Sequence, residues 1–322
     1  MTGASSSRVA AADAESIRRA AEILRAGGLV AFPTETVYGL GADASRERAV
    51  ARIFEAKLRP RFNPLIVHVR DLGHAQSLGS FDAAARCLAE AFWPGPLTLV
   101  VPRRPDCPIA LLASAGLDTI AIRVPSHPVA RELLTESGLA IAAPSANASG
   151  AVTATRAGHV IESLGAAMDL VLDGGPAPLG LESTIIGFDQ ERPLLLRPGA
   201  LPRAAIEGVV GALGTTPGDV IVSPGRLRSH YATRAPLRLG ACEPRKSEAL
   251  LAFGPNVPAH AGPLLNLSPA SDLREAAANL FAMLRELDAA GCASIAVMPV
   301  PEHGLGEAIN DRLRRAAAPK GE

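Results

Sequence analysis

The chain has few aromatic residues, few lysines and no net charge. Aromatic residues make up 3% of its 322 residues, which argues against a nucleic-acid groove lined by stacking side chains. Lys+Arg and Asp+Glu both total 32, so the formal net charge is zero. A neutral chain has no global field that attracts nucleic acid or an anionic membrane. Any site for an anion must therefore be local.

Cysteines and long apolar runs are scarce as well. The chain has four cysteines, with no C-x-x-C pair and no histidines at zinc-site spacing, so we expect isolated thiols in a reducing compartment. No run approaches the ~18 apolar residues that span a bilayer. The N-terminus also lacks the apolar segment of a signal peptide. These absences predict a cytoplasmic protein with no membrane partner.

The usual signatures of nucleotide, covalent and metal chemistry are missing too. There is no G-x-x-x-x-G-K-[ST] phosphate loop and no G-x-S-x-G nucleophile elbow. Residues 39–44 match G-x-G-x-x-A, but polar residues separate them from the preceding strand, and no acidic residue follows at dinucleotide spacing. His68 and His74 lack the spacing of a helical metal pair. The sequence predicts no resident metal site.

Apolar residues in the first two thirds alternate between helical and strand patterns. Residues 14–25 carry a helical stripe that Gly27 is placed to end. Strands are expected at 29–32, 65–69, 97–101, 119–124, 139–143, 169–173 and 183–188. Several are apolar throughout, as in a sheet covered on both faces. The pattern predicts an α/β domain with an open, twisted mixed sheet flanked by helices.

A second unit follows a stretch rich in Gly, Pro, Ser and Thr. We place the first domain at 1–212, the linker at 213–236 and a smaller C-terminal α/β domain at 237–322. In that domain, Ser268 and Pro269 are expected to begin a helix that runs to about residue 289. A strand at 295–300 and a last helix rich in arginine complete it.

A basic cluster stands between a helix and a strand in the first domain. Lys57, one of only three lysines in the chain, lies two residues before Arg59. A compact ammonium and a planar guanidinium at this spacing suit phosphate oxygens, although each alone could be solvated surface charge. We expect neither residue to contribute to the core. Arg123 differs, because a guanidinium within an apolar strand needs an anion nearby.

Other polar residues gather at strand ends, where open α/β sheets bind ligands. Thr119 should face the same side of its strand as Arg123. Each residue has a simpler reading: Ser145 and Asn147 could form a turn, and His68 could be a satisfied core histidine. Taken together, the polar residues indicate a pocket for a polyanion such as phosphate. They are Thr36, Asn63, His68, Thr119, Ser145, Asn147, Ser183 and Arg197.

An ordered set of motifs resembles a known family. PTETVYGLG, IFEAKLRP..NPLIVHV, WPGPLT, AGLDTIAIRVPSHP, APSANASG, LDGG, ESTII and LLRPG occur in the order found in the YrdC-like threonylcarbamoyl-AMP synthases. The paired signature K-x-R and S-x-N stands here as residues 57–59 and 145–147. The linker SPGRLRSHYA and the smaller domain are similar to the two-domain branch, whose second domain is Rossmann-like.

The resemblance implies that L-threonine, bicarbonate and ATP give threonylcarbamoyl-AMP and pyrophosphate. A downstream transferase would then use the product to modify the adenosine beside the anticodon in tRNAs that read ANN codons. Mg²⁺ is expected with ATP, held mostly by phosphates and water. Lys57 and Arg59 would be catalytic, with Lys57 near the phosphates. Threonine would contact Thr36, His68, Arg123, Ala143 and Ser183. ATP would contact Arg59, Asn63, Thr119, Ser145, Asn147, Thr153, Arg197 and Tyr231.

Some positions depart from the family pattern, and two alternatives stay open. The usual Ser-Pro-Thr appears as Thr153-Ala154-Thr155, and Arg226 replaces a common methionine in the linker. One alternative is an RNA-binding module, against which the zero net charge and few aromatics count. The other is a YrdC-like paralogue that acts on another substrate. Direct binding of tRNA is left undecided.

Overall fold

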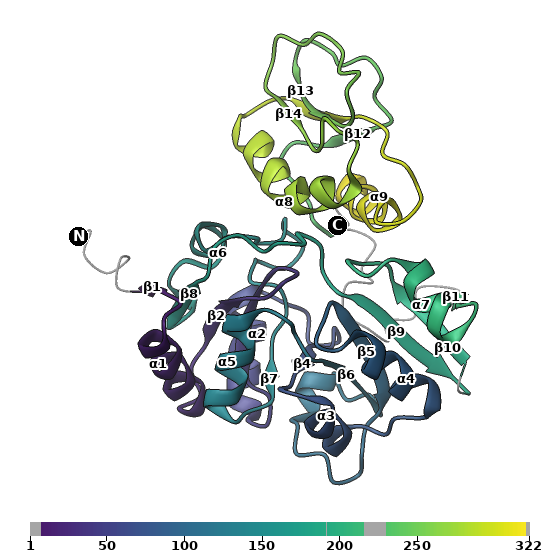
Figure 1. Ribbon diagram of the computed structural model, residues 1–322. Coiled ribbons are helices and arrows are strands. Elements are labelled where there is room, and N and C mark those ends of the chain that lie inside the picture. The colour runs from purple at the N-terminus through teal and green to yellow at the C-terminus, as the bar shows by residue number, and fades with distance from the viewer. Residues whose placement is uncertain (1–7, 191, 216–229, 320–322) are drawn as a thin grey trace, which may run out of the picture.

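The computed structural model describes residues 8–190, 192–215 and 230–319. Two sheets, each flanked by helices, form two units of unequal size (Figure 1). The prediction of a mixed α/β domain followed by a smaller α/β domain is confirmed. Within the described ranges, no helix is long and apolar enough to cross a membrane.

The larger sheet has eleven strands and mixes parallel with antiparallel pairs. Near its centre the short strand β7 (Ile141–Ala142) runs antiparallel to both of its neighbours, while β4 (Ile66–His68) and β6 (Thr119–Arg123) are parallel to each other. In spatial order the other strands are β1 (Val9–Ala11), β8 (Leu170–Asp173), β2 (Val30–Pro33) and β3 (Tyr38–Asp43) before β7, then β4 (Ile66–His68), β6 (Thr119–Arg123), β5 (Leu97–Pro102), β9 (Thr184–Asp189), β10 (Arg192–Arg197) and β11 (Gly214–Thr215).

Strand β3 contains all but the last residue of the G-x-G-x-x-A match, which the sequence pattern does not predict as a strand. It pairs antiparallel with β2 and is buried throughout. A Cβ at Gly41 would come within 2.7 Å of the Phe32 ring and 2.9 Å of Ile141. The glycine therefore allows close packing in the sheet rather than the approach of a dinucleotide.

Helices cover both faces of this sheet. The helices α1 (Ala14–Arg25) and α5 (Pro128–Ser137) pack on one face. The predicted bounds of α1 are confirmed, and Asp13 caps it by accepting a hydrogen bond from the Ser16 amide. The other face carries α2 (Glu47–Lys57), α3 (Leu72–Leu78), α4 (Ala83–Phe92), α6 (Ala157–Leu164) and α7 (Arg203–Val210), with the 3₁₀ turns η2 (Leu111–Ser114) and η3 (Gly165–Ala167).

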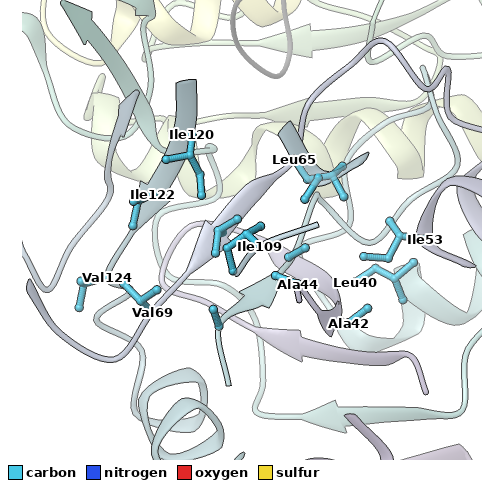
Figure 2. Packing of buried hydrophobic residues seen from close by; sticks show 14 of the residues in the cluster. Leu40, Ala42, Ala44, Ile53, Leu65, Val69, Ile109, Ile120, Ile122 and Val124 are labelled. Atoms are coloured by element: carbon cyan, nitrogen blue, oxygen red, sulfur yellow. The ribbon is translucent and has the colours of Figure 1, made fainter. Parts of the chain in front are cut away.

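The core on this second face joins strands from the whole width of the sheet. Figure 2 shows Leu40 and Ala42 of β3 near Ile53 of α2, with Ile120 and Ile122 of β6 across the same layer. All five side chains are almost completely buried. This rigid layer fixes the strand ends from which the polar residues project.

The smaller sheet has four parallel strands. They lie in the order β12 (Leu237–Leu239), β15 (Ser294–Val297), β13 (Glu248–Ala252) and β14 (Leu264–Asn266). The helices α8 (Leu273–Ala289) and α9 (Gly306–Ala317) lie between this sheet and the first domain (Figure 1). Most of the predicted linker lies outside the described residues, and the predicted domain boundaries stay a prediction.

The predicted start of α8 at Ser268 is wrong. The helix begins at Leu273, and the Asp272 side chain caps it by accepting from the Arg274 amide. Ser268 is fully buried four residues earlier, where its hydroxyl donates to Glu275 and accepts from the Asp272 amide. Ser268 therefore shapes the turn before the helix.

Candidate functional site

A pocket lies where strand ends of the larger sheet meet the segment that enters the second domain. Of the predicted residues, those that line it are Thr36, Arg59, His68, Arg123, Ala143, Ser145, Ser183, Arg197 and Tyr231. Those that do not line it are Lys57, Asn63, Thr119, Asn147 and Thr153. Two lining residues that sequence reasoning missed, Glu182 and His230, bring a carboxylate and a second imidazole.

Arg123 is held at one side of the pocket by the tight turn between β2 and β3. Its Nη1 donates to Thr36 Oγ1 at 2.8 Å, and its Nη2 lies 2.6 Å from Glu35 Oε1. Burial favours a raised pKa for Glu35, but the charge of Arg123 outweighs it and lowers the pKa. The anion predicted beside Arg123 is thus present within the chain, as Glu35.

Arg59 and Arg197 supply two further guanidinium groups that use only part of their donors. Arg59 donates to the carbonyls of Asn63 and Pro64, at 3.2 and 2.9 Å. Arg197 donates twice to the Ser183 carbonyl, at 3.2 and 2.7 Å. Within the described chain, Nη1 of each arginine has no hydrogen-bond partner.

The two arginines also lie close enough to influence each other. Burial, and then the charge of Arg197, lowers the pKa of Arg59 to about 10. Burial, and then the charge of Arg312, lowers the pKa of Arg197 to about 10. Both groups remain charged at neutral pH. Two buried cations with donors to spare are suited to a polyanion.

Lys57 behaves differently from the prediction. It is 1% exposed, so its interpretation as solvated charge and the expectation that it makes no contribution to the core are both wrong. Its ammonium donates to the Ser145 carbonyl at 2.6 Å and to the Asn147 carbonyl. Burial, and then the charge of Arg59, lowers its pKa. The K-x-R and S-x-N signatures are therefore joined by hydrogen bonds. Arg59, 8% exposed, is buried against the same expectation.

Two asparagines lie behind the lining. The Asn147 amide donates to the carbonyls of Ala148 and Ala151, both at 2.9 Å, as a turn requires. Asn63 is 1% exposed, and neither atom of its amide has a hydrogen-bond partner in the described chain. A buried amide without partners is costly, so Asn63 needs a polar ligand or water.

Two buried histidines contribute neutral imidazoles. His68, on β4, and His230, just after the undescribed segment, each have an Nδ1 with no partner among the described residues. Burial is the largest cause that lowers the pKa of each to about 3. His68 is therefore not a satisfied core histidine. Each ring offers the pocket one nitrogen that can accept or donate.

Thr119 and Thr153 do not line the pocket, while Tyr231 lines it and also packs against the second domain. Thr153 donates to Glu182 Oε1 at 2.8 Å. Thr119 pairs with Pro102, at the opposite end of β6 from Arg123. Tyr231 packs against the second domain, with its ring centroid 5.2 Å from that of Phe281.

The chemistry of this arrangement is positioning and electrostatic. The lining carboxylate, Glu182, is paired, and Ser183 shares a hydrogen bond of 2.7 Å with Thr98 rather than with a base. Among the described residues, no group of three or more His, Cys, Asp or Glu side chains could hold a metal ion. The pocket can bring anionic and polar groups together and offset their charge.

Two family models and several relatives match this chain over most of its length. A family model described as telomere recombination matches residues 22–199, and one described as threonylcarbamoyl-AMP synthase, C-terminal domain, matches residues 201–318. The chain is 40% identical to the threonylcarbamoyl-AMP synthase of Bacillus subtilis, over 94% of this chain and 92% of that protein. Identity to the synthase of Pyrococcus abyssi is 42%, over 94% of each.

Solved structures show the same relationship. The structure of P. abyssi Sua5 complexed with L-threonine is 38% identical and matches with a TM-score of 0.87, covering 96% of both chains. A doubly substituted variant of that protein matches with a TM-score of 0.86, covering 95% of this chain and 93% of that one. The likeness extends through both domains.

Proposed function

Since this chain belongs to the YrdC-like threonylcarbamoyl-AMP synthase family, we propose that it makes threonylcarbamoyl-AMP and pyrophosphate from L-threonine, bicarbonate and ATP. The observation that carries the proposal is the pair Arg59 and Arg197. Both are buried in one pocket, and each keeps an Nη1 that no protein group in the described chain uses. Such a pair needs an external polyanion, and ATP supplies one.

The reaction requires positioning more than covalent help. The threonine nitrogen attacks the carbon of bicarbonate and water leaves, giving a carbamate. A carbamate oxygen then attacks the α-phosphorus of ATP, and the bond to the bridging oxygen breaks so that pyrophosphate leaves. Neither step needs an enzyme nucleophile, but both bring anions together. Arg59 and Arg197 offset that charge.

The residues divide between the two substrates. On this proposal threonine lies against Thr36, His68, Arg123, Ser183 and the backbone of Ala143. All five line the pocket, and two of them, Thr36 and Arg123, are joined by a hydrogen bond, while His68 and Arg123 lie opposite each other on β4 and β6. ATP takes Arg59, Arg197 and Ser145, with Tyr231 closing over it. Asn63 is assigned to the nucleotide because its buried amide has no partner among the described residues, although it lies behind the lining.

Lys57 acts through its neighbours. Its ammonium is bonded to the carbonyls on either side of Ala146, so it fixes the loop that presents Ser145. Magnesium enters with ATP as part of the substrate, held by phosphates and water. The lining carboxylate, Glu182, is occupied by Thr153 and Arg312 and is not available to the ion. The product then passes to a cytoplasmic transferase that modifies tRNA.

The test is pyrophosphate release by the purified chain. We expect release from ATP with Mg²⁺ to require threonine and bicarbonate together, and to give threonylcarbamoyl-AMP detectable by mass spectrometry. Serine and D-threonine serve as matched controls. Release that proceeds equally without threonine would reject the synthase and leave an ATPase or a paralogue with another substrate.

A further inference from the structure

Arg312 belongs to the second domain but is anchored in the first. It lies on α9 and is 0% exposed, the most deeply buried charged residue of that helix. Its Nε donates to Glu182 Oε2 at 3.1 Å, and its Nη1 donates to the Pro198 carbonyl at 2.6 Å. Asp311 accepts a further bond at 2.9 Å. One side chain thus joins the two domains next to the pocket.

The two anchors flank the pocket residues that would hold the nucleotide. Glu182 directly precedes Ser183, and Pro198 directly follows Arg197. Ser183 and Arg197 are themselves joined, since Arg197 Nη2 donates to the Ser183 carbonyl at 2.7 Å. Arg312 therefore bonds to Glu182, the residue before Ser183, and to Pro198, the residue after Arg197.

The Glu182 carboxylate could compete with an anionic ligand in this pocket. Its carboxylate lines the same cavity as Arg197, and a free carboxylate there would pair with that guanidinium. In the described chain no ion pair joins the two. Arg312 takes one oxygen of Glu182, and Thr153 takes the other at 2.8 Å. Both oxygens are thus committed elsewhere.

The second domain holds the Thr153 side of this arrangement as well. Arg285, on α8, donates to the Val152 carbonyl at 2.5 Å and to the Thr153 carbonyl at 3.3 Å. It also donates to Ser163 of α6 at 2.7 Å. Two arginines from two helices of the second domain therefore fix both partners in the bond between Thr153 and Glu182.

We propose that Arg312 is a positioning residue of the active site, which holds the Glu182 carboxylate away from Arg197 and so keeps Arg197 free to bind the anionic substrate. On this proposal the second domain contributes to the active site, because it supplies the residue that positions Glu182. The inference rests on the proposed function only in naming ATP as the anion.

The experiment is a double-mutant cycle read by calorimetric binding of a non-hydrolysable ATP analogue with Mg²⁺. The variants are Arg312→Met, Glu182→Gln and the two combined. We expect Arg312→Met to weaken analogue binding by about tenfold or more, and Glu182→Gln in the same chain to recover most of that loss. Threonine affinity, measured separately, should change much less.

Controls separate this role from simple docking of the domains. Arg203→Met removes another contact of α9 with the first domain, the pair of Arg203 with Glu307, and should leave analogue binding unchanged. If Arg312→Met does not fold, Arg312→Lys is used, because a lysine can satisfy only one of the two anchors.

The results of these measurements distinguish a failure of the positioning role of Arg312 from a failure of the proposed synthase function. Losses that simply add in the double variant, or wild-type affinity in a folded Arg312 variant, would overturn the positioning role while leaving the synthase intact. A wild-type chain that binds neither the analogue nor threonine would overturn the proposed function and this inference with it.

Discussion

The two domains bury charge in contrasting ways. In the second, Glu248 is 2% exposed and fully used: Arg238 donates to it at 2.8 and 2.5 Å, the Arg245 amide at 2.7 Å and Ser294 at 3.1 Å. In the first, Arg59 and Arg197 are nearly as buried, but each has donors that no described residue uses. The charge of Glu248 thus holds loops of the second domain together.

This contrast separates structural charge from charge that serves a ligand. A buried ion whose capacity is filled by the chain supports the fold, while one with donors to spare needs something from outside. Lys57 belongs to the first group despite standing in the binding signature, because its bonds go to loop carbonyls. Substitutions can test each assignment.

The largest effect is expected at Lys57. Lys57→Ala removes a donor from the carbonyls of Ser145 and Asn147. The Ser145 carbonyl keeps its bond from the Asn147 amide at 3.0 Å, but the Asn147 carbonyl loses the bond that the described residues give it. We expect the free energy of unfolding to fall by about 2–4 kcal/mol, and turnover to be lost with it. Lys57→Arg should approach the same loss of turnover, because a planar fork does not fit the place of a compact ammonium.

Urea unfolding and pyrophosphate release measure the two effects on the same preparations. Lys246→Ala is the matched control, since Lys246 is an exposed lysine of the second domain. A Lys57→Ala chain as stable as wild type would show that the two carbonyl bonds are not what holds the loop.

Arg123 comes next. Loss of the Arg123 guanidinium alone would leave the buried Glu35 carboxylate without its ion-pair partner. The variant to measure is therefore Arg123→Met combined with Glu35→Gln, compared with Glu35→Gln alone. We expect threonine affinity to fall about ten- to hundredfold, or roughly 1.5–3 kcal/mol, and ATP affinity much less. Calorimetry with each substrate measures both. Equal losses for the two substrates would place Arg123 outside the threonine site.

A pH dependence of intermediate size follows from the buried histidines. His68 and His230 have folded-state pKa values of about 3, well below the unfolded value of about 6.5. The unfolded chain therefore binds more protons between these values, so stability is complete above about pH 6.5 and falls as the pH drops.

Between pH 6.5 and 5 this amounts to ~1–2 kcal/mol for each histidine. Chemical unfolding across that range should show the decline in the wild type and a flatter profile in His68→Gln and His230→Gln. His303→Gln, at an exposed position of the second domain, should keep the wild-type slope. An unchanged slope in both buried-site variants would refute the assignment.

The smallest effect is expected at the partly exposed pair of Arg203 and Glu307. Its two side chains are each 30% exposed, so solvent screens their attraction. Arg203→Met should change the free energy of unfolding by about 0–1 kcal/mol, measured by urea unfolding. A loss well above 1 kcal/mol would contradict the expectation that solvent screens this pair.

Local patterns predicted the elements that depend on local forces. The helix α1 was bounded correctly because its apolar stripe and the flanking residues agree. Strand β3 was missed because its glycines and tyrosine resemble a loop, and they form a strand only when β2 and β7 lie beside them. The prediction that Ser268 caps α8 failed for a similar reason, because its hydroxyl accepts from the Asp272 amide in the turn before the helix.

The residues of the site, too, could be predicted only where the informative neighbours are close in the sequence. Arg123 was identified because a guanidinium in an apolar strand is conspicuous within a few residues. Glu182 was not predicted because its partner Arg312 lies 130 positions away, and a carboxylate without a visible partner is not expected in a site that binds anions. Lys57 resembles a surface residue for the same reason, because its carbonyl partners lie 88 and 90 positions away. No local pattern carries such information.

The order of strands in the larger sheet also has a consequence for synthesis of the chain. Strand β8 lies between β1 and β2, and its partner positions on β1 are about 160 residues away. At ~5–20 residues per second, a ribosome needs roughly 8–30 seconds to reach β8 after making β1. Throughout that interval β2 has an open edge, with unpaired amides and carbonyls that can pair with a neighbouring chain. The nascent protein should therefore depend on chaperones until its eighth strand emerges.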